Sequence, residues 1–141
     1  MFKQYDPGQI VVIFKGVQIL GYASGTFVKA SRTKETFAMS VGAGGDVVRV
    51  RSRDKTGSVA ITIQAASPTN DVLTGFIASD EATGSGVGAL LIKDLYGTTL
   101  ITADKAWLEK PADGEYAADS PDREWTICCA ELFISNGGST V

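Results

Sequence analysis

The sequence predicts a mainly β domain of about eight antiparallel strands with one α-helix, arranged as a two-sheet sandwich or a rolled barrel. Three observations support this class. Apolar and polar residues alternate along several short segments, as they do on a strand with one buried face. Glycine is frequent, with 16 residues against four prolines, and much of it falls between these segments. One segment alone has the apolar spacing of a helix, which would pack against one side of the sheet.

The most regular alternation lies between residues 45 and 64. Three arginines share one face of a strand that begins at Val47, and after a polar interval three apolar residues share the face of a second strand. These two sets are Arg49, Arg51 and Arg53, then Val59, Ile61 and Ile63. We expect a hairpin whose turn is Asp54-Lys55-Thr56-Gly57, because its glycine can adopt a positive φ. The charged face of this hairpin is either solvated or pressed against another chain.

Four segments are expected before this hairpin. Residues 9–20 predict a short hairpin that turns at Lys15-Gly16, and residues 26–32 predict a strand with weaker alternation. Residues 37–41 predict a half-buried strand. Its buried face would be formed by Phe37, Met39 and Val41. The glycine-rich residues 42–45 would be a flexible connection.

The predicted helix follows the hairpin. Ser67 is placed to cap it, Pro68 suits its first position, and the helix should end near Ser79. Its apolar stripe is Val72, Leu73, Phe76 and Ile77. Residues 80–88 then form a glycine-rich loop with two acids.

Three strands are expected in the last third of the chain, at residues 89–93, 98–108 and 123–134. Trp107 would share a face with Ile101 and Ala103. The last strand would have Trp125, Ile127, Cys129 and Phe133 on one face. Residues 1–134 therefore predict a single domain, and the Gly/Ser-rich residues 135–141 predict a flexible tail.

Composition argues against several functions. The net charge of −3 disfavours a surface built to hold nucleic acid, which needs a basic excess. The chain has no histidine, the commonest general base and metal ligand, and its two cysteines are adjacent. We interpret Cys128 and Cys129 as small apolar fillers, and we expect neither a metal nor a cofactor. No apolar run is long enough to predict a transmembrane segment.

A few residues suggest chemistry weakly. Two acidic pairs could act as glycosidase carboxylates, although each lies on a loop that we expect to be solvated. These pairs are Asp80 with Glu81 and Asp113 with Glu115. Gly84-Ser-Gly-Val-Gly88 precedes a strand rather than a helix, so it does not fit a phosphate cradle. The arginine row could contact phosphates, but a solvated face or ion pairs with a neighbouring subunit's acids fit better.

The order of several short stretches resembles that of the tail tube proteins of contractile-tailed bacteriophages, a group of small phage structural proteins. The resemblance spans nearly the whole chain, and no stretch in it is a catalytic signature. The stretches are Asp6–Val12, Gly21–Phe27, Asp46–Ser52, Gly57–Ile63, Ser67–Leu73, Leu91–Leu95, Gly97–Thr99 and Arg123–Thr126. The adjacent cysteines and the glycine-rich tail are not features that we associate with the family.

The resemblance implies a structural role and no enzyme activity. Such subunits form hexameric rings whose sheets join into one continuous barrel, and the rings stack into a hollow tube inside a contractile sheath. A baseplate and a tail terminator lie at the two ends, and the viral DNA passes through the lumen without specific binding. Tubes of pyocins and of type VI secretion share this architecture. The resemblance therefore implies a virion tail protein that is assembled in the host cytoplasm and inserts into no membrane.

We expect the lumen and the subunit contacts to involve the charged hairpin and the long loops. Two hairpins, residues 26–41 and residues 47–64, would supply most of the lumen-facing sheet. Residues 42–45, 80–88 and 111–122 would contact neighbours within and between rings. The candidate contact or lumen residues are Arg49, Arg51, Arg53, Asp54, Lys55, Asp80, Glu81, Asp113, Glu115 and Asp119.

Three alternatives remain at this level. The chain could be a monomeric β-sandwich module that binds a carbohydrate or a protein. Such modules usually expose an aromatic platform, whereas both tryptophans here lie on faces that we expect to be buried. It could also be a small hydrolase that uses loop carboxylates, which the absence of histidine disfavours. A bacteriocin or secretion-type tube subunit is the third alternative.

Overall fold

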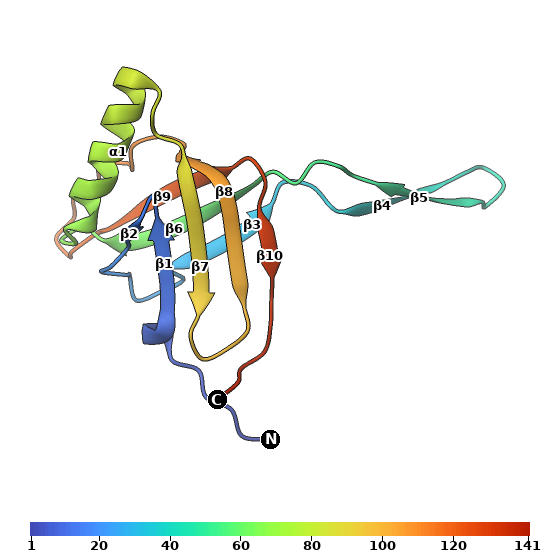
Figure 1. The fold of residues 1–141 in the computed structure, drawn as a ribbon, viewed down its shortest axis with the longest axis horizontal. Coiled ribbons are helices and arrows are strands. Elements are labelled where there is room, and N and C mark those ends of the chain that lie inside the picture. The colour runs from blue at the N-terminus through green and yellow to red at the C-terminus, as the bar shows by residue number, and fades with distance from the viewer.

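The computed structural model describes residues 1–141 and confirms a mainly β fold with one helix (Figure 1). There are ten strands, somewhat more than the number expected. The elements are η1 Pro7–Gln9, β1 Ile10–Phe14, β2 Val17–Gln18, β3 Val28–Arg32, β4 Phe37–Val41, β5 Val47–Arg51, β6 Gly57–Gln64, α1 Thr69–Thr83, β7 Gly88–Asp94, β8 Leu100–Leu108, β9 Asp122–Cys129 and β10 Phe133–Ser135.

One antiparallel sheet is bent into two layers. Its strand order is β2-β1-β7-β8-β9-β6-β3, and β10 pairs with β8 beside this path. The bend lies in β8, because Leu100–Thr102 pair with β10 while Ala106–Leu108 pair with β9. In Figure 1 the strands β1, β7, β8 and β10 run across β9, β6 and β3. The fold is therefore a rolled sandwich, as predicted.

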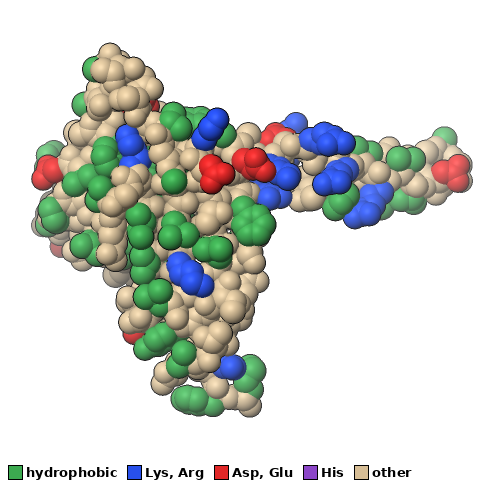
Figure 2. Space-filling model, in the orientation of Figure 1, with side chains coloured by type: hydrophobic (Ala, Val, Ile, Leu, Met, Phe, Trp, Pro, Cys, Tyr) green, Lys and Arg blue, Asp and Glu red, His purple; other side chains and the backbone are tan.

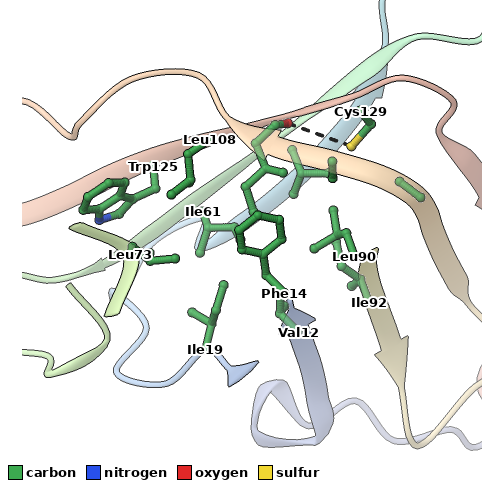
Figure 3. Packing of buried hydrophobic residues seen from close by; sticks show 14 of the residues in the cluster. Val12, Phe14, Ile19, Ile61, Leu73, Leu90, Ile92, Leu108, Trp125 and Cys129 are labelled. Atoms are coloured by element: carbon green, nitrogen blue, oxygen red, sulfur yellow. Dashed lines mark hydrogen bonds between the residues drawn. The ribbon is translucent and has the colours of Figure 1, made fainter. Parts of the chain in front are cut away.

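The core fills the space between these layers (Figure 3). Val59, Ile61 and Ile63 are fully buried, which confirms the predicted apolar face of that strand. Phe14 and Leu90 approach them from β1 and β7. Alternation with period two gives each strand one inward face, so the two layers bury their apolar faces against each other.

The helix α1 closes one end of the roll. The helix begins at Thr69, so Pro68 rather than Ser67 occupies the cap position, one residue later than predicted. Ser67 Oγ still accepts a hydrogen bond from the Thr69 amide (3.3 Å). Leu73 and Ile77 are buried, and the Phe76 ring packs edge-on against Phe14 with a centroid distance of 5.8 Å. The helix ends at Thr83, later than predicted. Polar residues continue it until Gly84, whose φ of 71° ends the helix in the left-handed region.

The predicted hairpin over residues 47–64 is wrong. β5 pairs with β4, whereas β6 pairs with β3 and β9. The actual turn is the glycine-rich segment between Val41 and Val47, where Gly45 has a φ of 90°. Residues 52–56 are no turn, because they carry the chain from β5 straight on to β6. The two expected hairpins, residues 26–41 and 47–64, are therefore replaced by one long hairpin. Its inner part is the pair β3 and β6, its outer part is the pair β4 and β5, and the strands are interrupted between the two parts.

Two predicted faces are also wrong. β8 contains a bulge, since Gly88 pairs with Ala106 but Leu90 pairs with Ala103. The extra residue shifts the alternation, so Ile101 and Ala103 are buried while Trp107 is half-buried. Strand β9 ends at Cys129, so Phe133 lies on the separate strand β10, where it is exposed.

The last residues lie beside the start of the chain and the turn between β7 and β8. Thr140 donates a backbone hydrogen bond to Tyr96 (2.7 Å), and Gln4 donates one to Val141 (2.8 Å). Ser139 forms a bridge with Gly97. Most residues of this segment are exposed, so its predicted flexibility stays a prediction.

Candidate functional site: a projecting arm

Strands β4 and β5 form an arm that extends away from the rest of the molecule (Figure 1). We define the arm as residues 33–56 and the body as the remaining residues. β4 and β5 form their own two-stranded sheet, and every one of their residues is exposed. Because residues 37–41 do not reach the core, the predicted half-buried strand is wrong for the isolated protomer.

The arm has two faces, set by its register. Residues directly opposite each other on antiparallel strands project to the same side. Phe37 lies opposite Arg51, and Ala38 lies opposite Val50. The arginine face comprises Phe37, Met39, Val41, Val47, Arg49 and Arg51. The valine face comprises Ala38, Ser40, Val48 and Val50.

The arginine face is organised by one stacking contact. The guanidinium of Arg49 lies over the Phe37 ring, 3.6 Å from its centroid. A guanidinium stacked in this way keeps its N–H groups free to bind a carboxylate at its edge. Arg53, predicted to continue the row, lies beyond the end of β5. The row therefore consists of two arginines in the strand and one in the connection that follows.

Charge is distributed unevenly between arm and body (Figure 2). The arm has five Lys and Arg residues and three Asp and Glu residues, which gives a net charge of +2. The body has eight Lys and Arg residues and thirteen Asp and Glu residues, which gives a net charge of −5. The ion pairs within the chain are Lys55 with Glu131 (3.6 Å) and Lys110 with Asp113 (3.5 Å). None of the arm's three arginines has a carboxylate partner in its own chain.

The root of the arm is held by one backbone hydrogen bond, one side-chain hydrogen bond and a turn. The Leu132 amide donates to the Lys55 carbonyl (2.8 Å), and Arg32 Nε donates to the Leu132 carbonyl (2.9 Å). Asp54 accepts hydrogen bonds from the Thr56 hydroxyl (2.6 Å) and amide (3.0 Å). The Thr56 hydroxyl bond, and then the amide bond, lower the pKa of Asp54. The bond from Leu132 to Lys55 connects the arm to the segment before β10, and the bond from Arg32 connects that segment to β3.

Gly57 fits the tight packing at this root. A Cβ at Gly57 would lie 2.6 Å from Leu132 Cδ2 and 2.7 Å from the Ser31 carbonyl oxygen. Leu132 is itself fully buried. The glycine predicted to serve a turn therefore permits close approach between β3, β6 and the segment before β10.

The acidic candidates from the loops form no ion pair with the arginines of the arm. Asp80 Oδ1 accepts a hydrogen bond from the Gly86 amide (3.1 Å) and so closes the loop after α1. Asp113 pairs with Lys110, and the Glu115 carbonyl accepts a bond from Arg123 (2.9 Å). Glu81 and Asp119 are exposed. The structure does not bring these carboxylates together with any nucleophile or metal-binding cluster.

The body carries one apolar groove, of about 480 Å³. It lies between the segment that enters β3 and the strands β1, β7 and β8. Phe27, Val28, Ile92 and Ile101 line it, with Asp94 and Tyr5 among the polar groups. No sequence signal identified this groove, because its walls come from segments far apart in the chain.

Burial raises the pKa of three groups: Tyr22 and Cys129, which belong to the core or pack against it, and Cys128, which is half-buried on the outer face of β9. Burial raises the pKa of Tyr22 to about 12, an effect only partly offset by the nearby Val12 backbone, and its hydroxyl makes no hydrogen bond of good geometry. Burial likewise raises the pKa of Cys129 to about 11 and that of Cys128 in the same direction. Raised pKa values keep both thiols protonated, so these cysteines are unsuited to nucleophilic chemistry.

The rolled β-sandwich with one helix is similar in fold to solved components of contractile injection systems. The fold matches the sheath/tube terminator of an extracellular contractile injection system, PVC, in its extended state (TM-score 0.65, 11% identity, covering 94% of this chain and 97% of that chain). It also matches the anti-feeding prophage cap, the AFP tube terminating cap (TM-score 0.65, 10% identity, 96% and 94% covered). At these identities the likeness concerns the fold.

The sequence identifies the family. The chain belongs to the family described as the bacteriophage PhiTE tail tube protein, whose model matches residues 14–137. It is also similar to the structural protein ORF10 of Pseudomonas phage KPP10, at 26% identity over 143 residues that cover 96% of this chain and 83% of that protein. The chain is therefore a structural tail tube protein of a virion tail, as the resemblance implied. Its single α-helix, of 15 residues, is too short and too polar to cross a membrane.

Proposed function

We propose that this chain forms hexameric rings that stack into the hollow inner tube of a contractile phage tail, the conduit through which the genome is ejected. Family membership supports the tube. The observation that carries the assembly is the arm, whose apolar side chains are exposed and whose three arginines have no carboxylate partner in their own chain. A surface of this kind is expected to be covered by other subunits.

Ring closure would use the open edges of the sheet. The strand order ends at β2 and β3, each with one side unpaired, and β10 has a free outer edge. Exposed edges attract further strands, and a closed ring of subunits removes them. Strand pairing between neighbours would then join the sheets into one barrel around the channel.

The outer face of the β3, β6 and β9 layer fits the lumen wall. Its side chains alternate with the core residues and are small or polar, with one base and two acids. They are Lys29, Ser31, Ser58, Ala60, Thr62, Gln64, Asp122, Glu124, Thr126 and Cys128. A wall with little charge and a slight acidic excess does not hold phosphate, so DNA would slide along it without specific binding. Of the residues expected to face the lumen, this proposal keeps those of β3 and β6.

The remaining expected contacts fit the periphery of the ring. Residues 42–45 form the tip of the arm. Residues 80–88, predicted as a loop, comprise the last turn of α1 and the connection to β7, and residues 111–122 are a mostly exposed loop that leads into β9. In this proposal, the tip and both loops contact subunits of the same or adjacent rings. The fold neighbours come from sheath-tube complexes and tube terminators, which supports a sheath outside this tube and a terminator at one end. A baseplate would lie at the other end, and assembly would take place in the host cytoplasm.

Oligomeric state tests the function directly. The purified chain, alone and co-expressed with its own baseplate genes, is analysed by size exclusion and negative-stain microscopy. Rings or tubes are expected. A monomer at every concentration and in both settings would instead favour a binding module or a hydrolase. Tubes found in particles that carry no genome would favour a bacteriocin or secretion-type tube.

A salt series tests the arginines. If Arg49, Arg51 and Arg53 pair with acids of neighbouring copies, tube length falls as salt rises towards molar concentrations, because salt screens charge pairs. Arg51→Glu would reverse one charge and reduce assembly, while Arg51→Lys keeps the charge and serves as the matched control. Tubes whose length ignores salt, together with normal assembly of Arg51→Glu, would refute the ion pairs.

A further inference from the structure

Both faces of the arm are apolar, which distinguishes it from a surface hairpin. A sheet that faces water on one side alternates between apolar and polar residues, whereas a strand buried on both sides reads as a continuous apolar run. Val47-Val48 and Val41 place valines on both sides of the ribbon. Met39 on the arginine face is 74% exposed, and Val48 on the valine face is 57% exposed.

The arm gains little from its own chain. It contributes no residue to the core and none to the apolar residues that pack against the core. A two-stranded hairpin without further packing is marginally stable in water. Its apolar side chains are therefore expected to be covered by something other than the body that bears it.

We propose that in the assembled tube the arm is inserted between two other copies of this chain, with its arginine face packed on one copy and its valine face on another. This inference rests on the proposed tube. Within that tube, the arm requires two partner copies, because contact with only one copy would leave its other apolar face exposed to water.

Charge complementarity identifies the occupant as this chain itself. The arm carries +2 and the body −5, and of the body's thirteen acidic residues only Asp113 and Glu131 form an ion pair within the chain. A guanidinium that loses water must meet a carboxylate or another acceptor. The arginine face therefore requires an acidic surface, and the body of another copy supplies one.

The two faces require different partners. The valine face has no charged side chain, and Ser40 is its single polar member. It fits an apolar or small-residue surface, whereas the arginine face fits an acidic one. One arm thus contacts two different patches, which is a heterologous contact. Contacts of this type generate rings or open stacks rather than closed dimers.

Single lysine substitutions on each face test the insertion. Val48→Lys places a charge on the valine face, and Met39→Lys places one on the arginine face. Val48→Ile and Met39→Leu are the matched apolar controls. Tube yield is measured by pelleting and negative-stain microscopy over a concentration series, with sheath protein present and absent. The urea midpoint of each monomer is measured as well, and it should equal that of the wild type because both sites are exposed.

We expect each lysine variant to raise the concentration needed for tube formation at least about tenfold, equivalent to about 1.4 kcal/mol per added subunit. The controls should stay within about threefold of the wild type. If only one lysine variant is impaired, the arm lies on a single surface and the inference is wrong. It is equally wrong if a variant forms normal tubes but no longer binds sheath, because sheath would then cover that face. Absence of tubes from the wild type would instead refute the proposed function.

Discussion

Strands β4 and β6 have the same kind of sequence and opposite environments. In β6, Val59, Ile61 and Ile63 alternate with polar residues and are fully buried in the body. In β4, Phe37 and Met39 alternate with Ala38 and Ser40, and all are exposed on the arm. Alternation therefore identifies an apolar face without identifying the chain that covers it. In this protein, the apolar face of β6 is covered within the chain, and that of β4 is exposed.

The largest contrast is expected from deleting apolar side chains in the two regions. Ile61→Ala should lower the free energy of unfolding of the monomer by about 2–5 kcal/mol, because it leaves a cavity in a packed core. Met39→Ala should change it by less than about 0.5 kcal/mol, since that side chain touches little in the monomer. Urea denaturation monitored by tryptophan fluorescence measures both. A comparable loss in Met39→Ala would mean that the arm packs on its own body in solution.

The junction between the two regions should be the next most sensitive place. Gly57→Ala should destabilise the monomer by about 1–3 kcal/mol, because the new Cβ would collide with Leu132 and with the Ser31 carbonyl. Gly75 in α1 has open space around it, so Gly75→Ala should instead stabilise by up to about 1 kcal/mol. Thermal unfolding of both variants separates a packing effect from a general effect of replacing glycine. Equal behaviour of the two would show that the root is not tightly packed.

The smallest effect is expected from acid at the root. The pKa of Asp54 is lowered in the folded chain by its bonds to Thr56, so the carboxylate stabilises the root at pH values above its unfolded pKa. That contribution is lost as the pH falls through the lowered folded value. The protection factor of the Thr56 amide, its exchange rate relative to the intrinsic rate at the same pH, should therefore fall as the pH is lowered, while the protection factor of a β6 amide such as that of Ile61 does not change.

Asp54→Asn is the control for this titration, because it removes the ionisable group and keeps an oxygen acceptor. The protection factor of the Thr56 amide in this variant should be lower at neutral pH and show no acid-dependent step of its own. An unchanged acid step would assign the titration to another carboxylate.

Much of the body could be predicted from the sequence. The strands around Ile10–Phe14, Gly88–Asp94 and Leu100–Leu108 appear close to where alternation placed them, as does the start of the helix. These elements depend on local patterns and on turn residues such as Lys15-Gly16. The bulge in β8 could not be anticipated, because its cause is the pairing with β7 rather than any residue within the strand.

The pairing of the arm could not be predicted for a related reason. Asp54-Lys55-Thr56-Gly57 and Gly42-Ala43-Gly44-Gly45 are both plausible turns, and local chemistry does not choose between them. The choice is made by β6, which lies between β3 and β9 and so cannot fold back on β5. The arginines were identified as candidates from their spacing alone. Their exposure, and the stacking of Arg49 on Phe37, depended on a partner strand that the sequence did not identify.

The continuity of β3 with β4 and of β5 with β6 has a mechanical consequence. A pull along the arm is transmitted directly into two strands of the body. β6 is hydrogen-bonded to β3 on one side and to β9 on the other, and its pairing with β9 runs along its whole length. Because such bonds lie perpendicular to the strands, tension along β6 loads many of them in shear together rather than opening them one after another. Tension applied to the arm would therefore be resisted by many hydrogen bonds of β6 at once.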